Sequence, residues 1–338
     1  MFTFKAFYNE NKNQISFKKT EEELPKLNSK DLLVKIEAVS LNPVDFKVAS
    51  GLLNKPNDQK TLGWDASGIV VKVGSEVKNF KIGDHVYYAG AIDRPGSNSE
   101  YQVVDERIVG QKPKSLTFKE AAALPLTAIT AYEALFTQLQ ISKNISDKPK
   151  KVLLVGAAGG VGSIAIQLLK SLTSSIVIAT ASRKESEDWV KSLGADYVIN
   201  HNNDFLKELN RIGFQDVDYI FCINGLESHF ENMANSIKTF GKIVTIDDPV
   251  NPLNMMLLKM KSVSFSWEFM FTHSLYQTED MISQHKLLNE VSQLVDLNKI
   301  KTTIGLDLGI MNEVNLEKSH ELLKTQKTIG KIVLGVNE

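Results

Sequence analysis

The stretch that decides the fold is Lys151-Val-Leu-Leu-Val-Gly156-Ala-Ala-Gly159-Gly160-Val161-Gly162-Ser163. Its apolar residues predict a buried strand, its glycines a tight turn, and the Ala, Ile and Leu residues that follow a helix. A dinucleotide pyrophosphate needs this geometry, because backbone N–H groups at a helix N-terminus face the anion. The residues expected to hold such a cofactor are Ala157, Ala158, Gly159, Gly160, Val161 and Gly162.

Two other interpretations of this turn compete with the first. Ala157 stands where the first glycine of G-x-G-x-x-G would be, so the match to the dinucleotide motif is imperfect. A P-loop requires Lys followed by Ser or Thr after the last glycine, and Ser163-Ile164 follows here. A glycine-rich turn without a ligand stays open, but the position between a strand and a helix favours the cofactor.

The regions on either side of this stretch have different patterns. The first third of the chain alternates short β-type runs with turns, which predicts a compact, partly barrel-like β domain. From residue 151 onward, β-branched runs alternate with amphipathic helical segments, as in a doubly wound parallel sheet. Helical spacing also runs over 121–136, and a long helix is expected at 280–297. The expected strands of the parallel sheet are 152–155, 176–179, 197–199, 219–223 and 243–246.

Composition narrows the function classes. The formal net charge is −1 and basic residues form no blocks, so no nucleic-acid partner is expected. The single cysteine, Cys222, excludes an internal disulfide and any zinc site built from several cysteines, and its apolar strand predicts a buried core position. Polar residues interrupt the N-terminal apolar ones, and glycines break the uncharged run 152–169. We expect a soluble, cytoplasmic protein without a membrane partner.

The end of the second strand of the parallel sheet indicates which nicotinamide is bound. An acidic residue there would accept from the 2′-hydroxyl of NAD, whereas basic residues accommodate the 2′-phosphate of NADP. The segment after strand 176–179 contains Ser182, Arg183 and Lys184, with no acidic residue at the strand end. We therefore expect NADPH. Ser182 and Glu185 also have the spacing of a helix capping box, and both roles can coexist.

Six segments in order match one protein family: 40–45, 62–68, 124–132, 157–162, 193–196 and 329–334. On these segments the chain resembles the medium-chain dehydrogenase/reductase superfamily, and most of all its quinone oxidoreductase branch. The resemblance implies an α/β fold with a doubly wound Rossmann cofactor domain, residues 123–272, inserted in a GroES-like catalytic domain, residues 1–122 and 273–338. Ala at the first glycine position is usual in this branch.

The resemblance also implies an assembly and further cofactor contacts. Members commonly form homodimers by pairing edge strands of their cofactor domains, here 262–267. Thr130 lies in the segment that approaches the nicotinamide in relatives, although its helical spacing also suits a solvated position. His201 follows the third strand, where relatives can stack an aromatic ring on adenine, although a lone loop histidine is usually only exposed.

The zinc ligands of the family are missing from this sequence. Zinc-dependent relatives use a cysteine, a Gly-His-Glu segment and a later ligand, but this chain has Asn42 and Gly63-Trp64-Asp65 at the first two places. An indole cannot ligate zinc, and one aspartate is insufficient. The four-cysteine lobe is replaced by a short loop around 94–98. We expect no metal.

Without zinc, the acceptor must already be electron-poor, as quinones and α,β-unsaturated carbonyls are. By resemblance, Asn42 and Asp45 line the site beside the nicotinamide: Asn42 would donate a hydrogen bond to the acceptor oxygen, and Asp45 would organise a water or the ribose. The competing interpretation is that Asn-Pro-x-Asp only forms a tight turn. Tyr88 could donate to the developing oxyanion, or simply pack in the core.

The sequence thus predicts a zinc-independent, NADPH-dependent oxidoreductase that reduces quinones or α,β-unsaturated carbonyls by hydride transfer. One alternative changes only the acceptor, to a 2-enoyl thioester or an aldehyde. Another is a non-catalytic, NADPH-binding scaffold. Catalytic turnover separates the scaffold from the enzymes.

Overall fold

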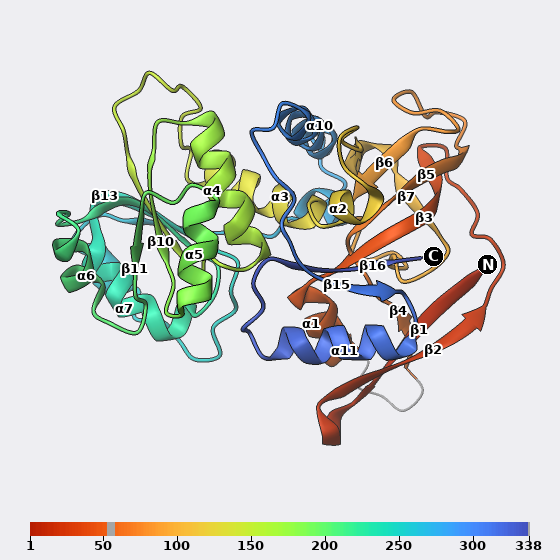
Figure 1. Ribbon diagram of the computed structural model, residues 1–338, viewed down its shortest axis with the longest axis horizontal. Coiled ribbons are helices and arrows are strands. Elements are labelled where there is room, and N and C mark those ends of the chain that lie inside the picture. The colour runs from red at the N-terminus through yellow and green to blue at the C-terminus, as the bar shows by residue number, and fades with distance from the viewer. Residues whose placement is uncertain (53–57, 337–338) are drawn as a thin grey trace. The chain divides into compact units, whose positions relative to one another are not determined.

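The computed structural model describes residues 1–52 and 58–336, which form two compact units (Figure 1). Unit 1 comprises Met1–Ile129 and Phe271–Glu338, and unit 2 comprises Thr130–Met270. The division between the units falls inside a helix, after Ile129. The first turn of that helix is tied to unit 1, because the N–H of Leu126 donates to Oδ1 of Asp65 (2.8 Å).

Unit 2 contains a six-stranded parallel sheet in the order β11-β10-β9-β12-β13-β14. Its strands are β9 (Lys151–Val155), β10 (Ile176–Thr180), β11 (Tyr197–Ile199), β12 (Val217–Cys222), β13 (Ile237–Thr245) and β14 (Ser264–Trp267). Its helices are α4 (Gly160–Leu172), α5 (Lys184–Ser192), α6 (Phe205–Arg211), α7 (Leu226–Ser236) and α8 (Met256–Lys259). In Figure 1, α4 and α5 lie on one side of the sheet, and α6 and α7 on the other. The predicted doubly wound sheet is therefore confirmed.

The core of unit 2 explains why its strands are apolar throughout. Leu153 of β9 and Ile220 of β12 pack with Phe205 of α6 and Phe230 of α7, and all four are buried. A parallel sheet covered by helices on both faces has no solvent-facing side, so its strands show continuous rather than alternating apolar runs. Cys222 belongs to this core, as the sequence predicted.

Unit 1 is built around a seven-stranded sheet and a three-stranded sheet. The larger has the order β15-β16-β3-β5-β6-β8, with β7 also paired to β3, and the smaller has the order β2-β1-β4. The strands are β1 (Phe2–Asn9), β2 (Gln14–Glu21), β3 (Asp31–Leu41), β4 (Lys60–Thr61), β5 (Ala66–Val73), β6 (His85–Tyr88), β7 (Tyr101–Asp105), β8 (Val109–Gln111), β15 (Ile304–Ile310) and β16 (Lys331–Gly335). Strand β3 pairs with β5, β7 and β16, so it joins both chain ends into one sheet.

The helices of unit 1 frame these sheets. They are α1 (Pro43–Leu52), α2 (Phe118–Ala122), α3 (Pro125–Tyr132, which crosses into unit 2), α9 (Thr272–Tyr276), α10 (Ile282–Asp296) and α11 (Glu313–Lys324). The sequence predicted one helix over 121–136, and the structure corrects this. Helix α2 ends at Ala122, α3 begins at Pro125, and a π-helix (η3) spans Glu133–Gln138. Proline lacks the N–H that an uninterrupted helix would require.

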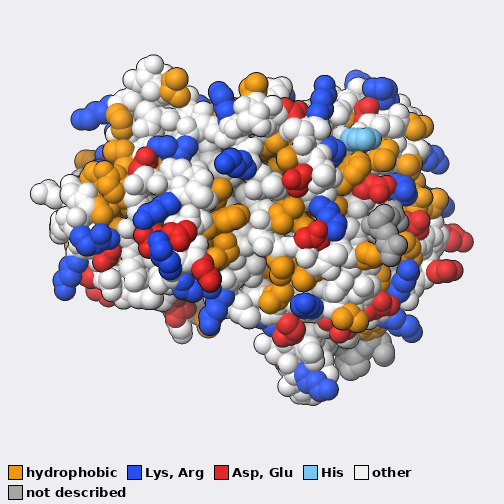
Figure 2. Space-filling model, viewed as in Figure 1, with side chains coloured by type: hydrophobic (Ala, Val, Ile, Leu, Met, Phe, Trp, Pro, Cys, Tyr) orange, Lys and Arg blue, Asp and Glu red, His pale blue; other side chains and the backbone are white. Residues whose placement is uncertain are grey.

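Two surface features bear on possible partners. On the face drawn in Figure 2, Lys and Arg side chains are interspersed with Asp and Glu, which matches the formal net charge of −1. Among the described residues, no helix has the length and apolarity to cross a membrane, and the uncharged run 152–169 forms β9, the glycine turn and most of α4.

Candidate active site

The glycine turn between β9 and α4 has the shape of an anion cradle. Gly159 is the N-cap of α4, and no described side chain caps this helix end. A Cβ built on Gly159 would meet nothing within 4 Å, whereas one on Gly162 would lie 2.3 Å from the carbonyl oxygen of Ala157. Gly162 therefore permits close packing, and Gly159 leaves open space above uncapped N–H groups. Both features fit a pyrophosphate.

Neighbouring side chains hold this turn in place. The hydroxyl of Ser163 donates to the carbonyl of Gly159 (2.8 Å) and accepts from Nε1 of Trp189 on α5 (2.8 Å). The N–H of Gly156 donates to Oγ1 of Thr180 at the end of β10 (3.0 Å). Gly156 has a φ of +83°, a backbone conformation that favours glycine. The predicted cofactor turn is thus rigidly connected to the two strands beside it.

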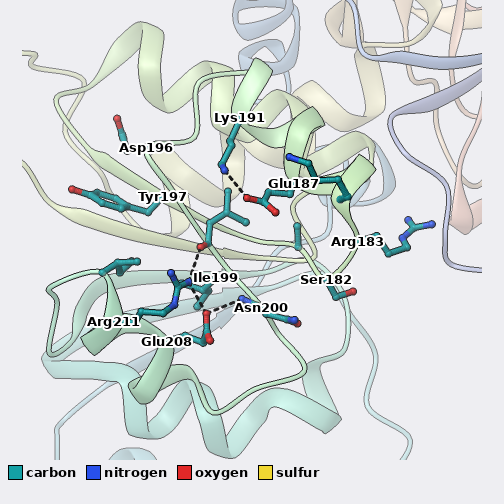
Figure 3. Close-up of a pocket in the computed structure, with 14 residues that line it drawn as sticks. Ser182, Arg183, Glu187, Lys191, Asp196, Tyr197, Ile199, Asn200, Glu208 and Arg211 are labelled. Atoms are coloured by element: carbon teal, nitrogen blue, oxygen red, sulfur yellow. Dashed lines mark hydrogen bonds and ion pairs between the residues drawn. The ribbon is translucent and has the colours of Figure 1, made fainter.

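A cavity of about 540 Å³ follows β11 between α5 and α6 (Figure 3). Its lining residues are Ala181, Ser182, Arg183, Lys184, Glu187, Lys191, Asp196, Tyr197, Val198, Ile199, Asn200, Glu208, Arg211 and Ile212. Figure 3 shows Ser182 and Arg183 at the end opposite Asp196 and Tyr197. The structure therefore brings together the three residues predicted to contact a 2′-phosphate, Ser182, Arg183 and Lys184, at the carboxyl end of β10.

Three of the cations that line this cavity, Lys184, Lys191 and Arg211, form ion pairs. Lys184 contacts Asp188 (2.6 Å), and Arg211 contacts Glu208 (2.8 Å). The guanidinium of Arg183 points away from the Lys191–Glu187 pair in Figure 3. Lys184 would have to leave Asp188 to receive an anion, and Arg183 is the N-cap residue directly before it.

The predicted capping box of α5 is wrong by one residue. The helix begins at Lys184, so Arg183 rather than Ser182 is the N-cap. The N–H of Arg183 donates to Oγ of Ser186 (3.3 Å), and that hydroxyl donates back to the Arg183 carbonyl (2.8 Å). Ser186 is buried, so its hydroxyl meets the helix end from inside, whereas Glu185 is exposed. Ser182 therefore lies outside the helix.

His201 and Thr130 occupy different surroundings. The positive charge of Arg183 and partial burial both lower the pKa of His201, with burial the larger cause. Its ring lies 5.7 Å from that of His229, and its Nδ1 has no hydrogen-bond partner among the described residues. His201 is therefore a neutral ring close to Arg183, but it does not line the cavity. Thr130 is buried in α3.

In unit 1, Asn42 and Asp45 form the start of α1. Oδ2 of Asp45 accepts from the backbone N–H of Asn42 (2.8 Å), and the Asp45 N–H donates to the Asn42 carbonyl (3.0 Å). The tight turn suggested by Asn-Pro-x-Asp is thus a helix N-terminus with Pro43 as its first residue. Oδ1 of Asp45 is buried and has no hydrogen-bond partner in the described part of the chain. Burial raises the pKa of Asp45 to about 7, although the hydrogen bond from the Asn42 N–H and the charge of Lys331 oppose this.

A buried ion pair lies beside this helix end. Oδ2 of Asp65 accepts from Nδ2 of Asn42 (2.8 Å) and from Nζ of Lys331 (2.9 Å). Lys331 also donates to the carbonyl of Leu41 (2.8 Å) and to Oδ1 of Asn42. Asp65, Asn42 and Lys331 are at most 4% exposed. Desolvation raises the pKa of Asp65, and the Lys331 charge opposes that effect.

Sequence reasoning missed Lys331 as a site residue. The sequence showed it only as the polar start of a closing apolar strand, and its partner Asp65 is 266 residues away. The available signal was a charged residue in an otherwise apolar strand, because a buried lysine needs a paired charge.

Trp64 and Tyr88 are both fully buried in unit 1. Nε1 of Trp64 donates to the carbonyl of Ala91 (3.1 Å), and its ring meets Phe271 edge-on at 6.2 Å. Tyr88 on β6 has an hydroxyl without a hydrogen-bond partner among the described residues, and burial raises its pKa. Tyr88 is thus a neutral donor, but it makes no hydrogen bond to Asn42 or Asp45.

The donor set at this site is unlike a metal centre. Within residues 1–52 and 58–336, no group of three or more His, Cys, Asp and Glu side chains could hold a metal ion. Both oxygens of Asp65 accept hydrogen bonds, from Leu126 and from the Asn42–Lys331 pair. The nearest charged neighbour of Asp65 is therefore a protein cation.

Comparisons with known proteins match the whole chain. The alcohol dehydrogenase GroES-like domain family matches residues 28–114, and the zinc-binding dehydrogenase family matches residues 160–284. A zinc-type alcohol dehydrogenase-like protein of Staphylococcus aureus is 39% identical over 95% of both chains. An NADPH-dependent alkenal/one oxidoreductase of Arabidopsis thaliana is 34% identical over 68% of this chain and 58% of its own.

A solved structure agrees with these matches. It is a Rhizobium etli protein whose name places it among zinc-dependent alcohol dehydrogenases, and it superposes with a TM-score of 0.92. The two sequences are 41% identical, and the match covers 100% of this chain and 98% of that one. These similarities extend over both units. The chain therefore belongs to the medium-chain dehydrogenase/reductase superfamily of nicotinamide-dependent oxidoreductases.

Proposed function

We propose that this protein is a zinc-independent, NADPH-dependent oxidoreductase that reduces quinones or α,β-unsaturated carbonyls by hydride transfer. The observation that carries the proposal is the ammonium group of Lys331, which bonds Asp65 and Asn42 in the interior of unit 1. Asn42 and Asp65 stand at the positions where zinc-dependent relatives, by the resemblance above, carry metal ligands.

This arrangement disfavours a divalent cation for an electrostatic reason. Zn²⁺ would have to displace or approach an ammonium that already neutralises Asp65. Asn42 offers an amide oxygen that accepts from Lys331, and Trp64 offers an indole whose N–H is bound to Ala91. Zinc favours thiolate, imidazole and carboxylate ligands in a tetrahedral set, and these residues supply one engaged carboxylate.

An acceptor that is already electron-poor needs less polarisation than a simple aldehyde, which supports quinones and enones. Nδ2 of Asn42 has two hydrogens and donates one to Asp65, so the second would serve the acceptor oxygen. Tyr88 would contribute a further neutral hydroxyl if the acceptor reaches it. The name of the Arabidopsis relative, which includes an alkenal/one substrate, supports the same class.

The choice of NADPH rests on the end of β10. Ser182, Arg183 and Lys184 line the cavity and would hold the 2′-phosphate. The turn from Ala157 to Gly162 would hold the pyrophosphate. His201 lies outside that cavity and, by the resemblance above, would stack on the adenine. When bound there, NADPH supplies the hydride. The Arabidopsis relative is NADPH-dependent by name, which supports this choice.

The proposal includes a homodimer formed through β14. This strand is at the edge of the six-stranded sheet, so its outer backbone groups can pair with another strand. Exposed apolar side chains on it and beside it, Met260, Trp267 and Phe269, would be covered by a second copy. A cytoplasmic location stays a prediction.

The test mixes chelator-treated protein with NADPH or NADH and follows cofactor absorbance against a panel of quinones and enones. We expect the protein to oxidise NADPH faster than NADH, and we expect the chelator to leave this rate unchanged. Activity that disappears on chelation and returns with zinc would overturn the zinc claim. If the protein binds NADPH but turns over no member of the panel, the acceptor would instead be a 2-enoyl thioester or an aldehyde, or the protein would be a non-catalytic scaffold.

A further inference from the structure

We propose that Asp45 is the proton donor of the reduction, holding the proton on Oδ1 and passing it to the acceptor oxygen as the hydride is transferred. The inference rests on the proposed function and adds to it the source of the second hydrogen. The geometry that points to it is the unequal bonding of the two carboxyl oxygens of Asp45.

One oxygen of Asp45 is anchored and the other is not. Oδ2 accepts from the N–H of Asn42 (2.8 Å), which fixes the carboxyl group at the first turn of α1. Oδ1 is buried without a hydrogen-bond partner in the described residues, and the residue as a whole is 0% exposed. Capping the helix needs only one carboxyl oxygen. Within the described residues, the second oxygen makes no hydrogen bond that would stabilise the fold.

The surroundings favour a proton on this oxygen. A buried carboxylate oxygen without a donor is costly, and a proton removes the charge. Burial raises the pKa of Asp45 to about 7, and the negative charge of Asp65 acts in the same direction. The hydrogen bond from the Asn42 N–H and the charge of Lys331 both lower the pKa, but burial outweighs them. The Lys331 ammonium bonds Asp65, Asn42 and Leu41 rather than Asp45.

Among the described elements packed on α1, two bring a charged or titratable side chain to Phe46. Helix α11 supplies Lys324, which lies over the ring of Phe46 at 5.0 Å. Strand β1 supplies Tyr8, whose ring meets the same Phe46 ring edge-on at 6.1 Å. The charged groups that act on Asp45 are Lys331 and Asp65.

The chemical step balances as follows for an enone. The β-carbon receives the hydride with its two electrons from NADPH, and the π electrons of the C=C bond move to give an enolate. The O–H bond of Asp45 breaks, its electrons stay on Oδ1, and the proton bonds the enolate oxygen. The enol then becomes the saturated carbonyl compound, and a proton from water restores Asp45. General acids of this kind contribute about 10²–10⁴-fold to a rate.

A nitroalkene provides the matched acceptor that needs no acid. Hydride addition to it yields a nitronate, an anion that is stable in water without immediate protonation. The experiment measures NADPH oxidation by the wild-type protein with cyclohexenone and with 1-nitrocyclohexene from pH 5.5 to 9. With the enone, we expect the rate to fall about tenfold per pH unit well above pH 7. With the nitroalkene, the same limb should be absent.

The variant Asp45→Asn keeps an oxygen that can accept from the Asn42 N–H but carries no acid proton. We expect the ratio of the enone rate to the nitroalkene rate to fall at least tenfold, with the alkaline limb lost. Asp84→Asn, on a loop of unit 1, is the control and should leave the ratio unchanged. Thermal melts establish whether both variants fold. If Asp45→Asn does not fold, the pH profiles of the wild-type protein with the two acceptors decide the question.

Three outcomes overturn the inference: equal rate losses with both acceptors, no loss with either, or the same alkaline limb for both acceptors. The first would leave Asp45 a positioning residue. Failure of the proposed function looks different, because wild-type protein would then oxidise NADPH with neither acceptor at any pH.

Discussion

Nζ of Lys331 lies 2.9 Å from Oδ2 of Asp65, and both side chains are almost completely buried. The pair joins the closing strand β16 to the loop before β5, so it links the two ends of unit 1. Removing one partner of such a pair leaves an uncompensated buried charge, which typically costs about 3–5 kcal/mol.

We therefore expect Lys331→Met to lower the urea midpoint of unit 1 strongly. The double variant Lys331→Met with Asp65→Asn should recover part of the loss, because the stranded charge is gone. Denaturation curves of the two single variants and the double variant form a thermodynamic cycle. Additive losses would show that the two groups do not act as a pair.

The two glycines of the cofactor turn should respond differently to alanine. Gly162→Ala places a Cβ 2.3 Å from the Ala157 carbonyl oxygen, so we expect a clear loss of thermal stability without any ligand. In Gly159→Ala the new Cβ has no neighbouring atom within 4 Å, and the φ of −75° at this position suits alanine. It should keep the melting temperature of the ligand-free protein but weaken NADPH binding, as measured by fluorescence titration. Equal effects on stability would contradict this assignment.

Arg183 should set the preference for NADPH. Hydrogen bonds to charged groups are worth about 1.5–3 kcal/mol, so Arg183→Ala should raise the Kd for NADPH roughly 10- to 100-fold. The Kd for NADH should change little, because NADH has no 2′-phosphate. Lys191→Ala is the matched control, since Lys191 also lines this cavity but does not follow the end of β10 directly. A similar loss of NADH binding in Arg183→Ala would refute the 2′-phosphate contact.

Two buried carboxyl groups in unit 2, Glu133 on the π-helix and Glu268 after β14, should make stability depend on pH. Burial raises the pKa of Glu268, and the charge and hydrogen bond of Glu133 raise it further. The folded protein then keeps a proton that the unfolded chain releases above its ordinary pKa near 4.5. Stability should therefore fall as pH rises above that value, by up to about 1.4 kcal/mol per pH unit for one group.

Glu268→Gln should remove much of this slope, because the amide cannot ionise. The exposed Glu231 on α7 offers the control Glu231→Gln, which should keep the wild-type slope. Melting temperatures between pH 5 and pH 9 test both variants. An unchanged slope in Glu268→Gln would exclude the carboxyl pair as its cause.

The sequence by itself determined the elements whose signals are local. The turn from Gly156 to Gly162, the apolar strands β9 and β10 and the amphipathic helix α4 between them follow from neighbours a few residues apart. The same local logic indicated that Asn-Pro-x-Asp makes a turn, because proline and the short polar side chains act on their own backbone. The resemblance to a known family then indicated how these elements combine into two domains.

Only the tertiary structure decided which charges meet. Lys331 and Asp65 are 266 residues apart, and Glu268 meets Glu133 across the fold of unit 2, so no spacing rule could join them. The N-cap of α5 is Arg183 and not the predicted Ser182, because the buried Ser186 hydroxyl bonds the backbone of Arg183 at the helix end. The unpartnered Oδ1 of Asp45 is likewise a product of burial. The physical reason is common to all of them: desolvation and pairing depend on what surrounds a group in space, and chain neighbours supply only part of that environment.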